Sequence, residues 1–303
     1  MHQAKALVIA VHDGQFHADD VFAVAVLRRR FGNIAVIRTR DPAKLAAADF
    51  RVDVGGRFAP EDGDFDHHQL GAPVRKNKYQ TPYSAFGLVW QQFGPQMEDK
   101  EIVQIVDRSL VQAIDSEDCG IAPWRDTPGQ KPATLDMVIE MCNPMWNELC
   151  ELRDKEAATL VAFDNAVRMA EIILDRAIQR AVAEIEARVR VRQAMQNAAD
   201  PRIVVMENDM PWQKTVIQEG KDVKFVVCRR SDGNWGARAV PLRQNGCELR
   251  CAFPESWAGK TDQELVAVSG VPDATFCHMA RFIAIAKSRD GAVRLAQLAL
   301  EAS

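Results

Sequence analysis

The sequence lacks an excess of positive charge, a close cysteine pair and any long apolar run. Its 303 residues include 38 lysines and arginines against 42 aspartates and glutamates, which gives a net charge of −4 at pH 7. Proteins that coat duplex nucleic acid electrostatically are usually basic. That class is therefore disfavoured, although a local basic groove is still compatible with this balance.

Cysteine usage and hydropathy also exclude several classes. The seven cysteines are odd in number and form no Cys-x-x-Cys pair, so we expect neither a disulfide framework nor a thiolate zinc site, and a reducing compartment is favoured. The apolar run 6–11 is too short for a signal peptide, and the run 21–27 is too short to cross a membrane. We therefore expect a cytoplasmic protein without membrane association.

Short apolar runs alternate with helical patterns in the first 70 residues. Buried strands are predicted at 6–11, 34–38 and 50–54, with a short fourth strand ending at 65–66. Helices are predicted at 18–30 and 42–47, each opened by aspartates. This alternation is typical of an α/β fold with a mostly parallel sheet.

The rest of the chain is predicted to be helical up to residue 200 and mixed beyond it. Helices are expected at 83–93, 98–114 and 157–189, strands at 203–206, 224–228 and 235–240, and helices at 261–268 and 290–300. One helix over 151–197 would be about 70 Å long, so we expect a break or a long connector there. We place one domain at 1–200, with the helical connector near 150–198, and a smaller α/β domain at 201–303.

Four of the six histidines fall in two short segments that also carry aspartates. The first is His12–Asp20 and the second is Asp66-His67-His68. Both follow predicted strands, and open α/β sheets bind ligands at the carboxyl ends of strands. For one segment alone, a satisfied His–Asp pair or a helix cap is the simpler interpretation. Two such segments at two strand ends favour a shared site.

Imidazoles mixed with carboxylates, without thiolates, suit manganese, iron or zinc. Two divalent ions with one bridging carboxylate need about six or seven ligands. The candidate ligands are His12, His17, Asp19, Asp53, His67 and Asp115. His68 would then be left to contact substrate, and Asp20 is interpreted as part of the helix N-terminus.

These motifs resemble the melanocyte-proliferating-gene family of metal-dependent hydrolases and exonucleases, within the DHH phosphoesterase superfamily. The resemblance rests on His12–Asp20, Asp53–Gly56 and Phe65–Gln69, with further matching blocks at Tyr83–Trp90 and Pro254–Gly259. It covers essentially the whole chain. It implies a DHH-type metal-binding domain followed by a smaller substrate-binding domain.

Carried over by position, the resemblance implies that His12, His17 and Asp53 hold one ion. Asp19, Asp53, His67 and Asp115 would hold the second, with Asp53 as the bridging catalytic carboxylate. His68 would contact the scissile phosphate or protonate the leaving oxygen. Manganese is the expected metal, with magnesium, iron and zinc as alternatives.

The sequence departs from the family pattern at two places. Cys119 stands where the family usually has asparagine, and Ala284-Ile285 replaces a Gly-Gly turn that would favour an anion-binding backbone. Substrate contacts are nevertheless assigned to Arg75, Lys78, His278, Arg281 and Lys287. A solvated surface is the alternative interpretation of these five residues.

The resemblance implies a metal-dependent phosphodiesterase, a 3′–5′ exonuclease acting on single-stranded RNA or short oligonucleotides. The alternatives are a non-catalytic, metal-stabilised RNA-binding or regulatory protein, and an inorganic pyrophosphatase. The long helix is compatible with a homo-oligomer.

Overall fold

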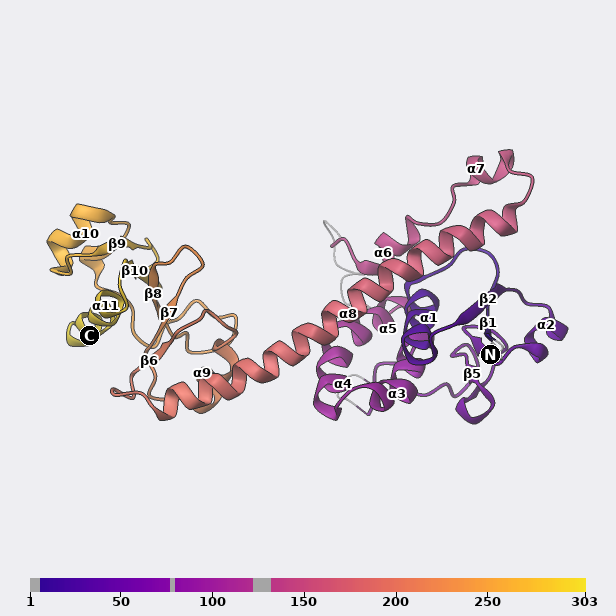
Figure 1. Cartoon of the computed structure of the whole chain (residues 1–303), viewed down its shortest axis with the longest axis horizontal. Helices are drawn as coiled ribbons and strands as arrows, with labels where there is room; N and C mark the ends of the chain where they lie inside the picture. The colour runs from indigo at the N-terminus through magenta and orange to yellow at the C-terminus, as the bar shows by residue number, and fades with distance from the viewer. Residues whose placement is uncertain (1–5, 77–79, 122–131) are drawn as a thin grey trace, which may run out of the picture. The chain divides into compact units, whose positions relative to one another are not determined.

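The computed structural model of the chain describes residues 6–76, 80–121 and 132–303. The chain divides into two compact units, Met1–Val182 and Ala183–Ser303. Each unit is built on a five-stranded sheet formed by the described residues (Figure 1). The expected mixed α/β fold is confirmed at this level.

The sheet of the first unit has the strand order β2-β1-β3-β5-β4. Its strands are β1 (Leu7–Val11), β2 (Ile34–Arg38), β3 (Phe50–Val52), β4 (Phe58–Ala59) and β5 (Asp64–Phe65). Only β4 runs antiparallel to its neighbour. The interior strand β1, between β2 and β3, is apolar at every position, as is typical of a strand buried on both faces, and Ile9, Ala10 and Val11 are fully buried.

The third strand ends two residues earlier than the sequence predicts. Asp53 follows Val52 with φ +54°, and Gly55 and Gly56 also have positive φ. A strand cannot continue through the left-handed region. The turn therefore starts at Asp53 and fixes this carboxylate at the end of β3.

Helices pack around this sheet in the first unit. They are α1 (Ala18–Phe31), α2 (Pro42–Ala47), α3 (Ala85–Met97), α4 (Lys100–Val106), α5 (Gln112–Asp118), α6 (Leu135–Glu140) and α7 (Trp146–Glu151). The helix expected over 98–114 consists of α4, a π-helical turn at Asp107–Val111, and α5. The side chain of Asp107, at the start of that turn, accepts hydrogen bonds from Arg75 and Gln112.

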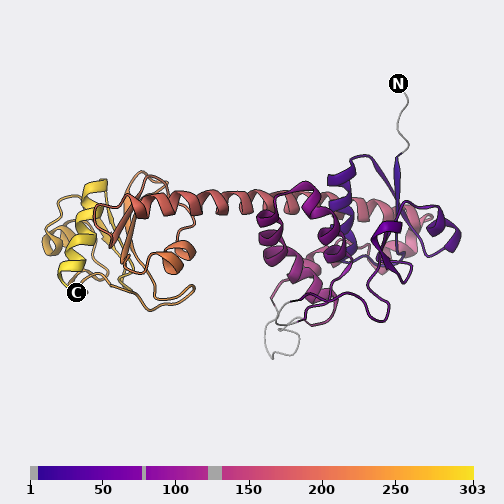
Figure 2. The same ribbon diagram turned by 90° about the horizontal axis from the view of Figure 1, so that it is seen from below.

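The 42-residue helix α8 (Lys155–Gln196) continues from the first unit into the second. Figure 2 shows that it is unbroken, so of the two alternatives expected here, a break or a long connector, the break is not found. The physical reason is that residues 155–196 contain neither glycine nor proline, the two residues that interrupt helices most strongly. Phe163, Val167 and Leu174 form part of its buried stripe.

The sheet of the second unit has the strand order β6-β7-β8-β10-β9. Its elements are β6 (Ile203–Met206), α9 (Gln213–Glu219), β7 (Phe225–Arg229), β8 (Trp235–Ala239), α10 (Asp262–Ser269), β9 (Ala274–Cys277), β10 (Ile283–Ala286) and α11 (Arg289–Glu301). β6 and β7 are parallel and the other pairs are antiparallel. The sequence analysis missed α9, β9 and β10. Across the described residues, no helix is long and apolar enough to cross a membrane.

Candidate metal centre

The loop after β1 places the first histidine against two carboxylates. His12 Nδ1 lies 2.8 Å from the carbonyl oxygen of Asp13, which leaves Nε2 to face the cluster. That nitrogen lies 3.3 Å from Asp20 Oδ2 and 3.3 Å from Asp53 Oδ2. Asp20 is also an N-terminal group of α1, because its Oδ1 accepts a 3.0 Å hydrogen bond from the His17 amide. Asp20 therefore orients His12 as well as the start of the helix.

The two carboxylate oxygens of Asp53 face two different histidines. Oδ2 lies 3.3 Å from His12 Nε2, and Oδ1 lies 3.3 Å from His67 Nε2. The Asp53 side chain is 3% exposed. The left-handed backbone at Asp53, which aspartate adopts more readily than most residues, turns the chain at the end of β3 and leaves this carboxylate at the strand end. The arrangement is that of a carboxylate able to bridge two cations.

Asp66 organises the backbone of the second motif. Its Oδ1 accepts hydrogen bonds from the His67 amide at 2.7 Å, the His68 amide at 3.2 Å and His68 Nδ1 at 2.8 Å. Its Oδ2 accepts one from the Gly56 amide at 2.6 Å. The buried Asp66 thus ties the Asp53–Gly56 turn to the two histidines. The His68 side chain remains 65% exposed.

His67 faces three carboxylates. Its Nε2 lies 3.3 Å from Asp53 Oδ1, 3.3 Å from Asp118 Oδ2 and 3.8 Å from Asp19 Oδ2. Cys119 Sγ lies 4.0 Å from the other ring nitrogen. Asp118 is the residue that the sequence analysis did not select. The only signal available was its position one helical turn after Asp115.

Asp115 lies apart from this cluster. Its carboxylate pairs with Arg75 and accepts hydrogen bonds from Ser84 Oγ at 2.6 Å and from the Gly87 amide at 3.1 Å. A Cβ built at Gly87 would lie 2.3 Å from Asp115 Oδ2, so glycine is needed for this approach. Asp115 is fully buried, and its partners hold α5 to α3. The structure therefore does not bring it together with the other five ligand candidates.

Arg75 is likewise engaged inside the fold. It is 4% exposed and contacts Asp107 at 2.7 Å as well as Asp115. Its guanidinium also lies over the Tyr83 ring, 4.1 Å from the centroid. Such a side chain is not available to a substrate. Lys78, the other basic candidate in this region, lies outside the described residues.

The three candidates of the second unit lie around β10. His278 Nδ1 accepts a 2.9 Å hydrogen bond from the Ala280 amide, and Arg281 Nη1 donates to the Phe253 carbonyl at 3.2 Å. Lys287 is exposed and follows the other end of β10. Ala284 and Ile285 lie within this strand, paired with both β8 and β9. They therefore form no anion-binding turn.

The cluster is rich in negative charge, and its carboxylates are mostly buried, whereas His17 and His68 are exposed. Burial and the neighbouring charges of Asp53 and Asp118 raise the pKa of Asp19, and burial also raises the pKa of Asp118. Burial alone would lower the pKa of His12 and His67, yet the carboxylates that face them, Asp20 and Asp53 for His12 and Asp53 and Asp118 for His67, raise both pKa values to about 10. His12 and His67 are therefore protonated at neutral pH in the folded chain, because their positive charge offsets the negative charge of the neighbouring carboxylates.

Several of its buried polar atoms make no hydrogen bond within the part of the chain that the structure describes. They are His12 Nε2, Asp19 Oδ1, Asp20 Oδ2, Asp53 Oδ1 and His67 Nε2. Buried polar atoms are normally satisfied, and metal ligands are an ordinary exception. Four groups of three residues could each hold an ion, because within each group the ligand atoms lie within 4.8 Å of one another. The groups are His12/His17/Asp53, Asp53/His67/His68, His67/Asp118/Cys119 and His17/Asp19/Asp118. The residues therefore fit divalent cations that prefer nitrogen and oxygen ligands.

These features define an α/β protein with a candidate metal centre at the carboxyl ends of its N-terminal strands. The model of a family described as "Uncharacterised protein family (UPF0160)", the MYG1 family, matches residues 8–300. The chain belongs to this family.

Its relatives include two vertebrate proteins and a yeast protein. "MYG1 exonuclease" of Mus musculus is 29% identical over 96% of this chain and 84% of its own length, and that of Homo sapiens is 29% identical over 96% and 85%. "MYG1 protein C694.04c" of Schizosaccharomyces pombe is 31% identical over 97% of both chains.

Proposed function

We propose that this chain is a divalent-metal-dependent phosphodiesterase of the DHH type that acts as a 3′–5′ exonuclease on single-stranded RNA or short oligonucleotides. The observation that carries the proposal is the placement of Asp53, whose two oxygens face His12 and His67 inside a buried cluster with unsatisfied ligand atoms. The name of the mammalian relatives, MYG1 exonuclease, supports a nuclease activity.

The chain offers ligands for two ions that share Asp53. His12, His17 and Asp53 would hold one, and Asp19, Asp53, His67 and Asp118 the other. Asp118 takes the place assigned to Asp115 from the sequence, because Asp115 is committed to Arg75. Manganese is the proposed metal. Divalent ions in such a site supply a nucleophile at neutral pH and offset the negative charge of the phosphoryl oxygens.

The protein's own contribution includes a proton donor next to the cluster. Asp66 accepts from His68 Nδ1 at 2.8 Å, which fixes the ring and leaves Nε2 for another partner. Since His68 is largely exposed while its neighbour His67 is buried, it is the histidine of the pair that a substrate can reach. We assign to protonated His68 the donation of a proton from Nε2 to the leaving oxygen.

A single cleavage assay tests the proposal. Purified wild-type protein with added Mn²⁺ is incubated with a 5′-labelled single-stranded RNA, beside Asp53→Asn. The matched control is Asp13→Asn, because Asp13 is an exposed carboxylate of the loop that carries His12. We expect a ladder that shortens from the 3′ end with wild type and Asp13→Asn, and none with Asp53→Asn.

Two outcomes would contradict the proposal. The first is full activity in a folded Asp53→Asn protein. The second is a metal-loaded wild type that binds RNA without cleaving it under any divalent ion, which would favour the non-catalytic binding protein. Rapid phosphate release from pyrophosphate, without RNA cleavage, would instead favour a pyrophosphatase.

A further inference from the structure

The five-stranded sheet of the second unit has one face that helices cover only in part. The structure describes all of residues 183–303, and none of their helices packs on the β8, β10 and β9 half of that face. On one face, α10 and α11 contribute Leu265, Leu295 and other residues to a continuous core. On the opposite face, the end of α8 and α9 cover β6 and β7 through Val191 and Val216. Beyond β7, that face continues over β8, β10 and β9 without a helix upon it.

Along β8, β9 and β10, successive side chains point alternately to this open half and to the core on the other face. Arg238 on β8 is paired with Ile283 on β10, and Ile285 on β10 is paired with Phe276 on β9. All four line one hollow of about 400 Å³, together with Phe282. Their strand neighbours Ala237, Ala284 and Ala286 point into the core on the other face. The open face is therefore built from larger apolar and basic side chains.

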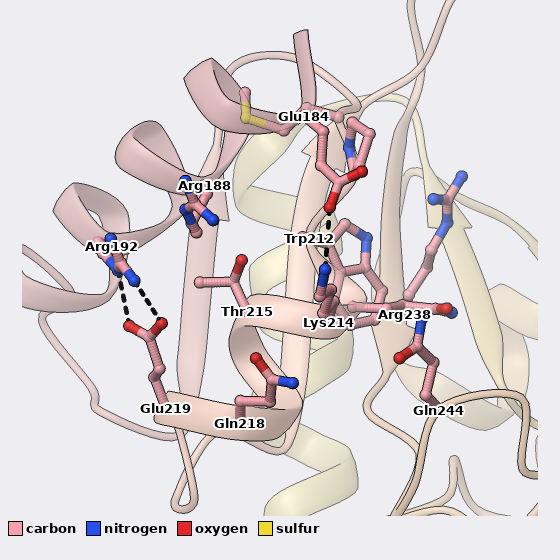
Figure 3. Close-up of a pocket in the computed structure, with 13 residues that line it drawn as sticks. Glu184, Arg188, Arg192, Trp212, Lys214, Thr215, Gln218, Glu219, Arg238 and Gln244 are labelled. Atoms are coloured by element: carbon pink, nitrogen blue, oxygen red, sulfur yellow. Dashed lines mark hydrogen bonds and ion pairs between the residues drawn. The ribbon is translucent and has the colours of Figure 1, made fainter. Parts of the chain in front are cut away.

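A second hollow, of about 580 Å³, lies at α8 and α9. The two hollows share Trp212, Gln213 and Arg238, so we treat them as one groove. Figure 3 shows the second hollow, with Arg188 and Arg192 on the α8 side and Lys214 and Arg238 on the other. The first hollow contains Phe276 and Phe282, and the second contains most of the basic side chains.

Positive charge predominates along the groove. Its lining includes five cations, Arg188, Arg192, Lys214, Arg230 and Arg238, and two carboxylates, Glu184 and Glu219. Glu184 contacts Lys214 at 3.0 Å, and Glu219 contacts Arg192 at 2.7 Å (Figure 3). Arg238 and Arg230 are likewise held by Asp209 and Asp232, at 2.8 and 3.2 Å. These contacts orient the cations and keep their donor groups gathered along the groove, in a chain of net charge −4.

Aromatic rings stand at the other end. Phe282 is 41% exposed, although it borders an apolar sheet. Its ring centroid lies 4.5 Å from that of His278, which in turn lies 6.2 Å from that of Phe276. The exposed Phe282 and the half-buried Phe276 lie in one hollow with Arg230 and Arg238. Accessible aromatic rings beside basic side chains are the combination with which proteins hold single strands, with bases on the rings and phosphates on the cations.

We propose that this groove binds a segment of single-stranded nucleic acid, with bases stacked on Phe282 and Phe276 and phosphates at Arg238 and Lys214. The inference rests on the proposed function and extends it by naming where the substrate is gripped away from the bond that is cut. A second copy of the chain fits less well, because it would have to bury five cations. A duplex fits less well, because its bases are not free to stack on the rings.

The test measures binding separately from cleavage. Fluorescence anisotropy of a labelled, unstructured RNA is recorded in an Asp53→Asn background, so that the probe stays intact. Phe282→Leu keeps an apolar side chain and removes the ring, and we expect binding roughly 5- to 150-fold weaker, the range found for loss of one stacked base. Phe282→Trp keeps a ring and should bind at least as tightly as the Asp53→Asn parent protein.

Substitutions at the basic end of the groove should change how the RNA affinity depends on salt concentration. Arg238→Gln should reduce the slope of log affinity against log salt concentration by about 0.7, as expected for one lost phosphate contact to a single strand. Phe282→Leu should leave that slope unchanged. The matched control is Arg294→Gln on α11, where the arginine is also paired with a carboxylate, Glu301, at 3.0 Å. Thermal unfolding of each variant verifies that it folds.

The outcomes separate this inference from the proposed function. If Phe282→Leu and Arg238→Gln both bind RNA with the affinity and the salt slope of the Asp53→Asn parent protein, the proposed RNA binding at the groove is overturned, even if the wild type cleaves RNA. Weakened binding in these variants, with no cleavage by the wild type, would support the groove and contradict the nuclease. Loss of self-association in Phe282→Leu with unchanged RNA affinity would also overturn it, and would assign the face to a second copy.

Discussion

The side-chain amide of Asn143 holds the backbone of Phe16 at two points. Asn143 Oδ1 accepts from the Phe16 amide at 2.9 Å, and Nδ2 donates to the Phe16 carbonyl at 2.9 Å. Phe16 lies in the loop between His12 and His17, and its ring is fully buried. Residues more than 120 positions apart in the sequence thus fix the loop that carries two candidate ligands.

Replacing this amide should weaken metal binding without unfolding the protein. We expect Asn143→Ala to bind Mn²⁺ about 10- to 100-fold more weakly, the range found when groups that orient metal ligands are removed. Calorimetric titration of chelator-treated protein measures the affinity, and circular dichroism verifies the fold. Asn147→Ala, on the exposed side of α7, is the control. Equal affinity in the two variants would show that the loop holds its shape without Asn143.

Asp115 and Asp118 should separate into a stability role and a ligand role. Asp118→Asn removes an oxygen 3.3 Å from His67 Nε2 and should lower Mn²⁺ affinity or stoichiometry. Asp115→Asn removes the charge that pairs with buried Arg75 and should cost about 3–5 kcal/mol of unfolding free energy. Denaturant unfolding and metal titration of both variants check this. The reverse pattern, with metal lost in Asp115→Asn alone, would restore Asp115 as the ligand.

The contrast between these two aspartates shows where sequence reasoning stops. The apolar run before His12 predicted β1 correctly, and the two His/Asp segments pointed to residues that the fold brings together. Which aspartate of α5 joins them depends on helix rotation and on Arg75, whose partner lies 40 positions away. No local pattern in the sequence carries that information.

The second unit was harder to predict for related reasons. β9 and β10 have only four residues each, and their turn at His278–Arg281 contains no glycine or proline. Arg281 adopts φ +58° there without the residue type that normally signals it. The groove also escapes a sequence analysis, because Arg238 and Phe282 become neighbours only through strand pairing.

Metal binding should strengthen as pH rises. In the metal-free chain, the neighbouring carboxylates raise the pKa of His12 and His67 to about 10, so both rings carry protons at neutral pH. A metal ion binds only the deprotonated nitrogen, and each displaced proton makes the apparent affinity rise up to about tenfold per pH unit below that pKa. Mn²⁺ titrations at pH 6.5 and 8.0, repeated in buffers of different ionisation enthalpy, measure the affinity and the released protons. A pH-independent affinity with no proton release would contradict the proposed ligand set.

Asp66 should act on the reaction mainly by orienting His68. Asp66→Asn keeps the size of the side chain but removes one of the two oxygens that hold Gly56 and His68. We expect kcat for RNA cleavage to fall about 10- to 100-fold, because a misplaced general acid loses most of its typical contribution, while the Mn²⁺ stoichiometry stays that of wild type. His68→Gln should lose at least as much. If the two side chains act as one unit, the double variant should be no slower than His68→Gln, since effects of coupled residues do not add. Additive losses in the double variant would mean that Asp66 serves the Asp53–Gly56 turn, and through it the metal centre, independently of His68.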